Sequence, residues 1–163
     1  MIRGKLIEST HMKLAEALIQ RADHRKRLDQ LRERLVRVAR VQEGDPPAEE
    51  PAALLAEVER TAAGLTRLIQ RINRTNSTTA LDDGRTIADA IAERDTLRLR
   101  HTLLTTLLQA ASIKQDRLTK SEVRFQRTVD IVALQQQTDD LAQTYRELDT
   151  KIQAANWLVN LVD

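Results

Sequence analysis

Cysteine is absent from the 163-residue sequence, and aromatic residues make up only 2% of it. Without cysteine, the chain has no disulfide, no thiolate zinc ligand and no cysteine nucleophile. A protein without disulfides is compatible with a reducing compartment, and we expect a cytoplasmic protein. No apolar run approaches the length of about 18 residues that a membrane-spanning helix needs, so we expect no membrane span.

Helix-forming residues dominate the composition, whereas there are only four glycines and three prolines. Apolar residues account for 41% of the chain and charged residues for 31%, with a formal net charge of +2. This apolar content is patterned and too high for a disordered chain, and the length is sufficient for one domain with a buried core. The composition therefore predicts folded helices.

Residues 1–11 resemble an expression leader. His11-Met12 is typical of a cloning junction, and Met12 begins a stretch that reads as a natural start. The alternative is a native, poorly ordered N-terminus. We therefore treat residues 12–163 as a single helical domain.

Apolar residues recur at heptad spacing in four segments, which we expect to be helices at residues 12–41, 52–74, 86–115 and 131–160. The last of them has an a/d seam that passes through Leu134, Leu141 and Leu148. A short connection makes the first two helices an antiparallel hairpin. The fold prediction is all-α: an antiparallel four-long-helix bundle with coiled-coil-like seams.

Two polar or alternating segments interrupt these helices. Residues 73–85 are predicted to be a helix end followed by a loop. Thr86 and Asp89 then form a capping-box pattern. Residues 116–130 alternate apolar and polar side chains, which predicts a short extended arm before the last helix, although a helix is the competing interpretation. Asp130 is placed to cap that last helix.

The third predicted helix has two apolar faces instead of one. One face contains Ile87, Ile91, Leu97, Leu104, Leu108 and Ala111, and the second contains Leu99, Leu103, Leu107 and Ala110. Two apolar faces indicate burial on two sides, so this helix is either central or part of an interface between subunits. This pattern is the basis for predicting a homo-oligomer.

Polar and ionisable residues lie on or near the apolar seams and are predicted to form a buried network. The set is Arg21, His24, Arg94, His101, Asp139, Asp140 and Arg146. An arginine on an apolar seam requires a carboxylate, so one interpretation is structural ion pairs, with Asp95 among the candidate partners. The other is an arginine-lined cleft for an anion or phosphate.

The first predicted helix is basic, with nine Lys or Arg residues against four Asp or Glu residues between Lys13 and Arg40. The simpler interpretation is a solvated helix face that also packs against acidic neighbours, and we expect the acidic last helix to pair with the first. The alternative is a phosphate or nucleic-acid contact. Its candidate residues are Arg25, Lys26, Arg32, Arg37 and Arg40.

No sequence motif for catalysis or metal binding is present. The sequence has no G-x-S-x-G, Walker or H-E-x-x-H pattern. Neither His24 nor His101 has a ligand-type residue four positions further on, so a zinc site is not predicted. We expect no enzyme, no catalytic residue, no cofactor and no metal.

Several segments together resemble a bacterial family of small helical proteins of unknown function that is labelled septicolysin. They are Met12–Leu18, Arg71–Asn76, Asp83–Thr86, Arg94-Asp95, Tyr145–Gln153 and Asn156-Trp157. The resemblance extends from Met12 to Trp157. Its label implies a membrane-active cytolysin. The residues themselves favour a cytoplasmic structural or interaction protein that self-associates, with nucleic-acid or anion binding through the first helix as the alternative.

Overall fold

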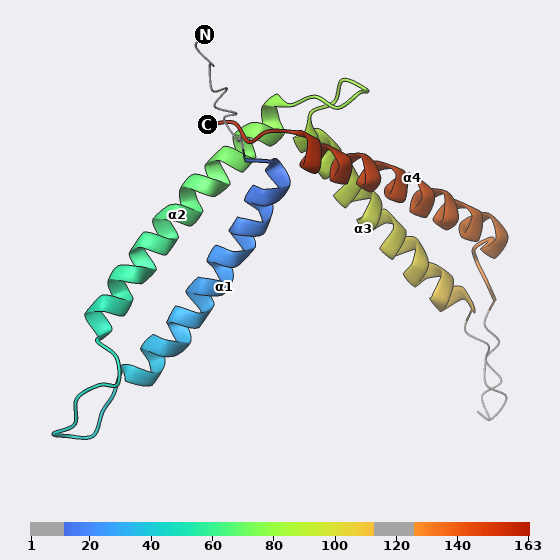
Figure 1. The fold of residues 1–163 in the computed structure, drawn as a ribbon. Coiled ribbons are helices and arrows are strands. Elements are labelled where there is room, and N and C mark those ends of the chain that lie inside the picture. Colours follow the sequence, from blue (N-terminus) through green and yellow to red (C-terminus); the bar gives the residue numbers. More distant parts are fainter. Residues whose placement is uncertain (1–11, 113–125) are drawn as a thin grey trace, which may run out of the picture. The chain divides into compact units, whose positions relative to one another are not determined.

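A computed structural model describes residues 12–112 and 126–163 (Figure 1). Within these ranges the chain forms four α-helices: α1 (Leu14–Val38), α2 (Pro51–Thr78), α3 (Ile87–Ser112) and α4 (Ile131–Leu158). The predicted all-α fold with four long helices is confirmed. The predicted leader, and most of the predicted extended arm, lie outside the described residues.

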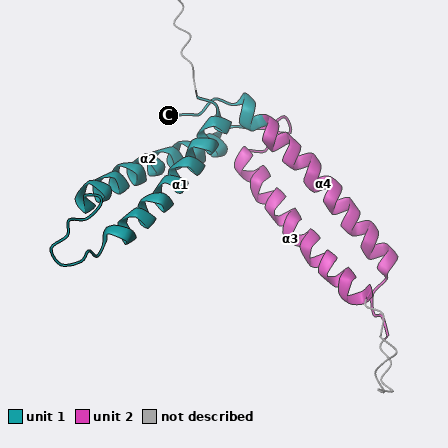
Figure 2. Ribbon diagram, turned by 60° about the horizontal axis from the view of Figure 1, so that its bottom comes forward, with its two compact units in different colours: residues 1–80, 155–163 teal, residues 81–154 magenta. Residues whose placement is uncertain are grey.

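The chain divides into two compact units, which Figure 2 shows in different colours. Unit 1 comprises residues 1–80 and 155–163, and unit 2 comprises residues 81–154. Unit 1 contains the hairpin of α1 and α2, and unit 2 contains α3 with most of α4. Each unit is built around one antiparallel pair of helices, and the short first connection predicted the pair in unit 1. The single folding domain over residues 12–163 stays a prediction.

The core of unit 1 lies along the facing seams of α1 and α2. Leu31, Val38 and Leu54 are buried together, and Leu35 and Val58 pack against them. The three residues of α1 in this cluster, Leu31, Leu35 and Val38, are spaced by four and three residues, so they form one stripe of the helix. The predicted hairpin of the first two helices is therefore confirmed.

Helix α2 continues to Thr78, so the prediction that it ends near residue 74 is wrong. The hydroxyls of Thr75, Ser77 and Thr78 each donate to the carbonyl oxygen four residues earlier, at 2.8–2.9 Å. These bonds satisfy the hydroxyls inside the helix, so the polar run need not form a loop. The chain leaves the helix at Thr79.

The two separated parts of unit 1 are joined by backbone hydrogen bonds. The N–H of Leu14 donates to the carbonyl of Val159 at 3.0 Å, and the N–H of Leu161 donates to Met12 at 2.8 Å. Lys13 and Asn160 form an antiparallel bridge between these bonds. Next along the chain, the N–H of Val162 donates to the hydroxyl of Thr75 in α2 at 3.0 Å. We call this arrangement the clasp, formed by residues 12–14 and 159–162 with Thr75.

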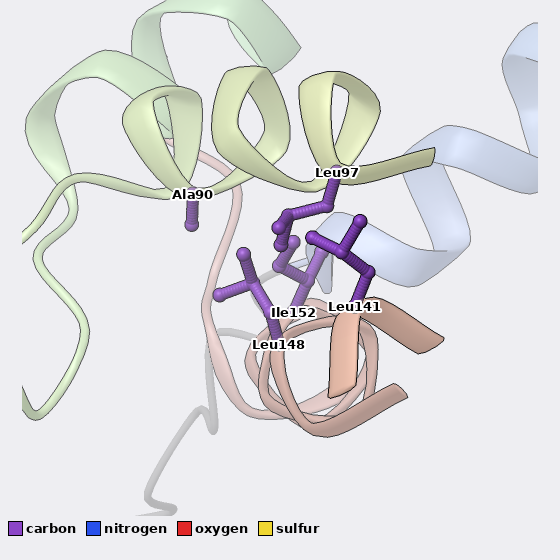
Figure 3. Packing of buried hydrophobic residues seen from close by; sticks show 5 residues of the cluster. All are labelled: Ala90, Leu97, Leu141, Leu148 and Ile152. Atoms are coloured by element: carbon purple, nitrogen blue, oxygen red, sulfur yellow. The ribbon is translucent and has the colours of Figure 1, made fainter. Parts of the chain in front are cut away.

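The core of unit 2 lies between α3 and α4 (Figure 3). Its buried residues are Ala90, Leu97, Leu141, Leu148 and Ile152. Side chains from the two helices point toward one another in Figure 3, and Tyr145 and Leu104 pack at the edge of the cluster. The a/d seam predicted for the last helix is therefore the surface of α4 that packs on α3.

Local hydrogen bonds begin both helices of unit 2 where the sequence predicted. At α3 the N–H of Asp89 donates to the hydroxyl of Thr86 at 3.1 Å, and the Thr86 hydroxyl donates to the Asp89 carboxylate at 2.6 Å. At α4 the carboxylate of Asp130 accepts from the N–H groups of Val132 and Ala133. The predicted capping pair and the predicted cap are confirmed.

Candidate interaction face and polar cleft

Helix α3 presents an exposed row of leucines on the side away from α4. Leu99 is 69% exposed, Leu103 is 64% exposed and Leu107 is 38% exposed. Leu97, which is buried against α4, lies two residues before Leu99, and two residues correspond to about 200° around an α-helix. We call Leu99, Leu103, Leu107 and the exposed Ala110 the leucine face. It is the second apolar face that the sequence predicted for this helix.

The leucine face differs from the exposed apolar residues of unit 1. Ile19, Val36 and Leu55 are also exposed, but their spacing in the chain does not place them in one row, and Trp157 and Leu158 are an exposed pair at the end of α4. Isolated exposed apolar residues are common on protein surfaces, whereas a continuous row indicates a contact surface. The leucine face is therefore the candidate interaction surface of the described residues.

Arg94, one of the predicted network residues, is held by two carboxylates on the flank of the α3–α4 pair. Its guanidinium lies 2.9 Å from Asp95 and 3.2 Å from Asp149. The predicted ion pair with Asp95 is confirmed, but the sequence analysis did not identify Asp149. Because Asp149 lies on the other helix, only the register between α3 and α4 could have revealed it.

A cleft of about 230 Å³ opens on unit 2 between α3 and α4. It is lined by Arg98, His101, Ala142, Tyr145 and Arg146. His101 and Arg146 belong to the predicted network, but Arg146 is exposed, so its predicted burial is wrong; Arg98 and Tyr145 were not predicted as site residues. The antiparallel packing of α3 on α4 places them together, because Leu97 packs in the same core as Leu141 and Tyr145. Neither arginine forms an ion pair within the described residues.

The remaining predicted network residues do not form a single cluster. Asp139 and Asp140 are exposed and accept hydrogen bonds from Gln135 and Gln136 of the same helix, so the prediction that they are buried is wrong. Their positions place them on the solvent side of α4, away from the seam of Leu134 and Leu141. Arg21 is half-buried on α1 and has no ion pair in the part of the chain that the structure describes.

His24 is half-buried and packs against a glycine of the neighbouring helix. Its Nδ1–H donates to the carbonyl of Gln20 at 2.8 Å, while Nε2 would lie 3.1 Å from a Cβ atom placed on Gly64 of α2. A side chain at position 64 would crowd the imidazole. The role seen for His24 is therefore helix packing within unit 1.

The predicted phosphate contacts of α1 are all exposed. These residues are Arg25, Lys26, Arg32, Arg37 and Arg40. Two other arginines of α1 are paired: Arg27 donates to Glu57 of α2 at 2.8 Å, and Arg34 donates to Glu49 at 3.0 Å. These acidic partners come from the neighbouring helix of the hairpin and the segment before it, not from the last helix that the sequence analysis considered.

Within the described residues, shifted pKa values occur at three groups of arginines and carboxylates, of which the group around Arg94 has been described above. The hydrogen bond from Arg34 holds the pKa of Glu49 below its ordinary value. The hydrogen bonds from the side chain and backbone of Arg85 lower the pKa of Asp83 to about 2. Arg85 also pairs with Glu93 of α3. The first pair joins α1 to the segment before α2, and the second joins Asp83 to Arg85 in the segment before α3.

Metal-binding and membrane-spanning features are not seen in residues 12–112 and 126–163. No group of three or more His, Asp or Glu side chains in these ranges could hold a metal ion. None of the four helices combines the length and the apolar character needed to cross a membrane.

The helix pairs and their surfaces define an all-α protein that presents an apolar helix face and a cleft lined by two arginines. The chain belongs to the family described as "Family of unknown function (DUF6847)", whose model matches residues 21–161. It is also similar to a solved structure described as a functionally unknown conserved protein from Corynebacterium diphtheriae. The two are 41% identical over 94% of this chain and 100% of that chain, with a TM-score of 0.87.

No curated protein matches the chain. Neither of the two descriptions mentions septicolysin, the label carried by the sequence resemblance. The comparisons therefore establish the family and the fold, and the function has to be argued from the surfaces described above.

Proposed function

We propose that the protein is a structural or interaction protein that self-associates through the leucine face of α3. The observation that carries this proposal is the row of Leu99, Leu103 and Leu107 in solvent, on a helix whose other side is already covered. Apolar surface that leaves water on association is the dominant favourable contribution to most protein–protein contacts. A second copy of the chain would cover this row.

The spacing of the leucine face fits a two-fold symmetric pairing. The three leucines are four residues apart, so Leu103 lies midway between Leu99 and Leu107. In an antiparallel pair of α3 helices with the axis at Leu103, Leu99 of one copy lies against Leu107 of the other. Closed two-fold dimers require this kind of self-complementary surface.

The charges along α3 are compatible with such a pairing. Residues 101–112 contain no Asp, Glu, Lys or Arg, whereas Arg98 and Arg100 lie near one end of the leucine face. Antiparallel pairing places these arginines opposite the uncharged half of the second helix. Like charges therefore do not meet across the contact, and the cost of repulsion is avoided.

The test of self-association is the substitution Leu103→Glu at the centre of the leucine face. Sedimentation or light scattering over a range of concentrations is expected to show an oligomer for the wild-type chain and a monomer for the variant. Val36→Glu on α1 is the matched control, since Val36 is 71% exposed but lies outside the leucine face. Circular dichroism checks that both variants keep their helices.

Two results would contradict self-association. One is a wild-type chain that is monomeric at all concentrations. The other is an oligomer that Leu103→Glu leaves intact while Val36→Glu dissolves it, which would place the contact on unit 1.

A second candidate function is nucleic-acid binding through α1, because the five predicted contact residues are all exposed. Acidic Asp29 and Glu33 are interleaved with them, which weakens the phosphate-binding surface. Retention on DNA or RNA that falls steeply with salt, and that is reduced by Arg25→Glu with Lys26→Glu, would support this function. Retention unchanged by the two substitutions would exclude α1 as the contact.

The lytic activity that the septicolysin label implies is separated from both functions by a liposome-leakage assay. Under the proposed function we expect no dye release. Cytoplasmic location stays a prediction from the sequence.

A further inference from the structure

We propose that the cleft of unit 2 binds a phosphate group, either as inorganic phosphate or as part of a small phosphate monoester. Two arginines, a histidine and a tyrosine line the cleft, and no acidic residue lines it. Guanidinium groups form paired, charge-assisted hydrogen bonds with phosphate oxygens, and a tyrosine hydroxyl can add another donor. This site is distinct from the proposed self-association surface.

The contrast with Arg94 shows why the cleft is a candidate for binding an external anion. Arg94, four residues before Arg98, already has Asp95 and Asp149 as partners. Arg98 and Arg146 lie on the same flank, yet the described residues supply no carboxylate within ion-pair distance of either. One turn of the α3–α4 pair thus neutralises its arginine internally, and the side chains of these two arginines on the next turn line one cleft.

The elements around the cleft fix the positions of these donors. Arg98 and His101 are three residues apart on α3, and Tyr145 and Arg146 are adjacent on α4. Residues three apart lie on one side of a helix. The ring of Tyr145 packs against the core cluster that contains Leu97 and Leu141, which restricts its rotamers. The hydroxyl of Tyr145 is therefore partly ordered before a ligand arrives, which lowers its share of the entropy cost of binding.

The volume of the cleft limits the size of the ligand that it can hold. A volume of about 230 Å³ is below the range of roughly 300–1,000 Å³ that is typical of sites for drug-sized ligands. A phosphate group with a short attached chain fits such a space, whereas a whole nucleotide would extend into solvent. Ala142 contributes to this space, since a larger side chain at that position would fill part of the cleft without changing its charge.

Isothermal titration with inorganic phosphate at low ionic strength tests the site. We expect saturable binding to the full chain that weakens by about tenfold or more in Arg98→Ala and in Arg146→Ala, as charge-assisted hydrogen bonds are lost. Ala142→Leu is expected to reduce affinity through steric filling. Arg100→Ala is the matched control, because Arg100 is an exposed arginine of α3 that does not line the cleft.

Further probes distinguish the ligand chemistry. Phosphoserine that binds at least as well as inorganic phosphate would assign the cleft to a phosphate monoester, and preference for inorganic phosphate would assign it to the free ion. Acetate that competes as well as phosphate would overturn the phosphate assignment in favour of a general carboxylate site.

Two other results would overturn the proposal altogether. Equal weakening by Arg100→Ala would show binding to surface charge alone. Unchanged affinity in the Arg98→Ala, Arg146→Ala double variant would exclude the cleft. Thermal unfolding shows whether each variant is folded, and Leu103→Glu is expected to leave phosphate affinity unchanged. Loss of self-association and loss of phosphate binding are therefore distinguishable.

Discussion

The two helical hairpins of this chain use the same architecture but distribute their polar and apolar residues differently. In unit 1, arginines of α1 pair with Glu49 and Glu57, and the exposed apolar side chains do not form a row along one helix, although Trp157 and Leu158 are exposed next to each other. In unit 2, leucines of α3 form a row in solvent, and two arginines face a cleft without acidic partners. The difference indicates that unit 1 uses two of its arginines to join its own elements, whereas the arginines and leucines of α3 in unit 2 supply candidate contact surfaces.

The largest loss of stability is expected when one core leucine is removed from each unit. Leu31→Ala in unit 1 and Leu148→Ala in unit 2 are each expected to lower the free energy of unfolding by about 2–5 kcal/mol, because each leaves a cavity. Urea unfolding gives the total loss, and hydrogen exchange shows where it occurs. We expect Leu31→Ala to weaken protection mainly in α1 and α2, and Leu148→Ala in α3 and α4. Equal loss of protection in all four helices from either variant would show that the units unfold as one.

A smaller loss is expected when the clasp of unit 1 is weakened. Thr75 is fully buried, and its hydroxyl accepts from the N–H of Val162. Thr75→Val keeps the shape but leaves that N–H without its acceptor, at a cost of about 1–3 kcal/mol. Faster amide exchange at Val162 is the measurement. Thr75→Ser is the control, since it retains the hydroxyl, and unchanged exchange in the valine variant would contradict the role of this bond.

A still smaller change in stability is expected in unit 1, where His24 lies close to Gly64. Alanine in a helix interior is favoured over glycine by about 1 kcal/mol. A Cβ at position 64 would meet His24 Nε2 at 3.1 Å, so Gly64→Ala alone should gain less than this. In a His24→Ala background the full gain is expected. A double-mutant cycle by urea unfolding measures the coupling, and additive effects would show that the two residues do not interact.

The smallest effect is expected at the turn before α3, at low pH. The pKa of Asp83 is lowered from 3.8 to about 2 by hydrogen bonds from Arg85. A carboxyl whose pKa is lower in the folded state stabilises fully above its unfolded pKa, and this contribution is lost as the pH falls through about 2. Asp83→Asn should therefore flatten the dependence of stability on pH between these values. An unchanged pH profile of thermal unfolding would be evidence against this ion pair.

The sequence predicted the features that depend on local patterns. Heptad spacing located the four helices, and the roles of Thr86, Asp89 and Asp130 followed from residue types at helix starts. The two apolar faces of α3 followed from spacing alone. These features depend on the order of residues within one element, which is why they could be predicted.

Features that depend on contacts between elements were missed. The burial of Thr75 near the end of α2 was missed, because the tail that contributes Val162 to its hydroxyl is far away in the sequence. The pairing of Arg94 with Asp149, and the meeting of Arg98 with Tyr145, depend on the register of α3 against α4. That register follows from which leucines meet in the core, and a single sequence does not specify it.

The clasp has a consequence for the order in which the chain folds during synthesis. Residues 12–14 complete their hydrogen bonds only with residues 159–161. Helices α1 and α2 can therefore pair early, whereas this edge of unit 1 is completed only after the last residues have been synthesised. Contacts between residues so distant in the chain slow folding. A ribosome-bound chain that stops before residue 159 should therefore hold the first hairpin in a form open to proteases, and release of the later residues should close it.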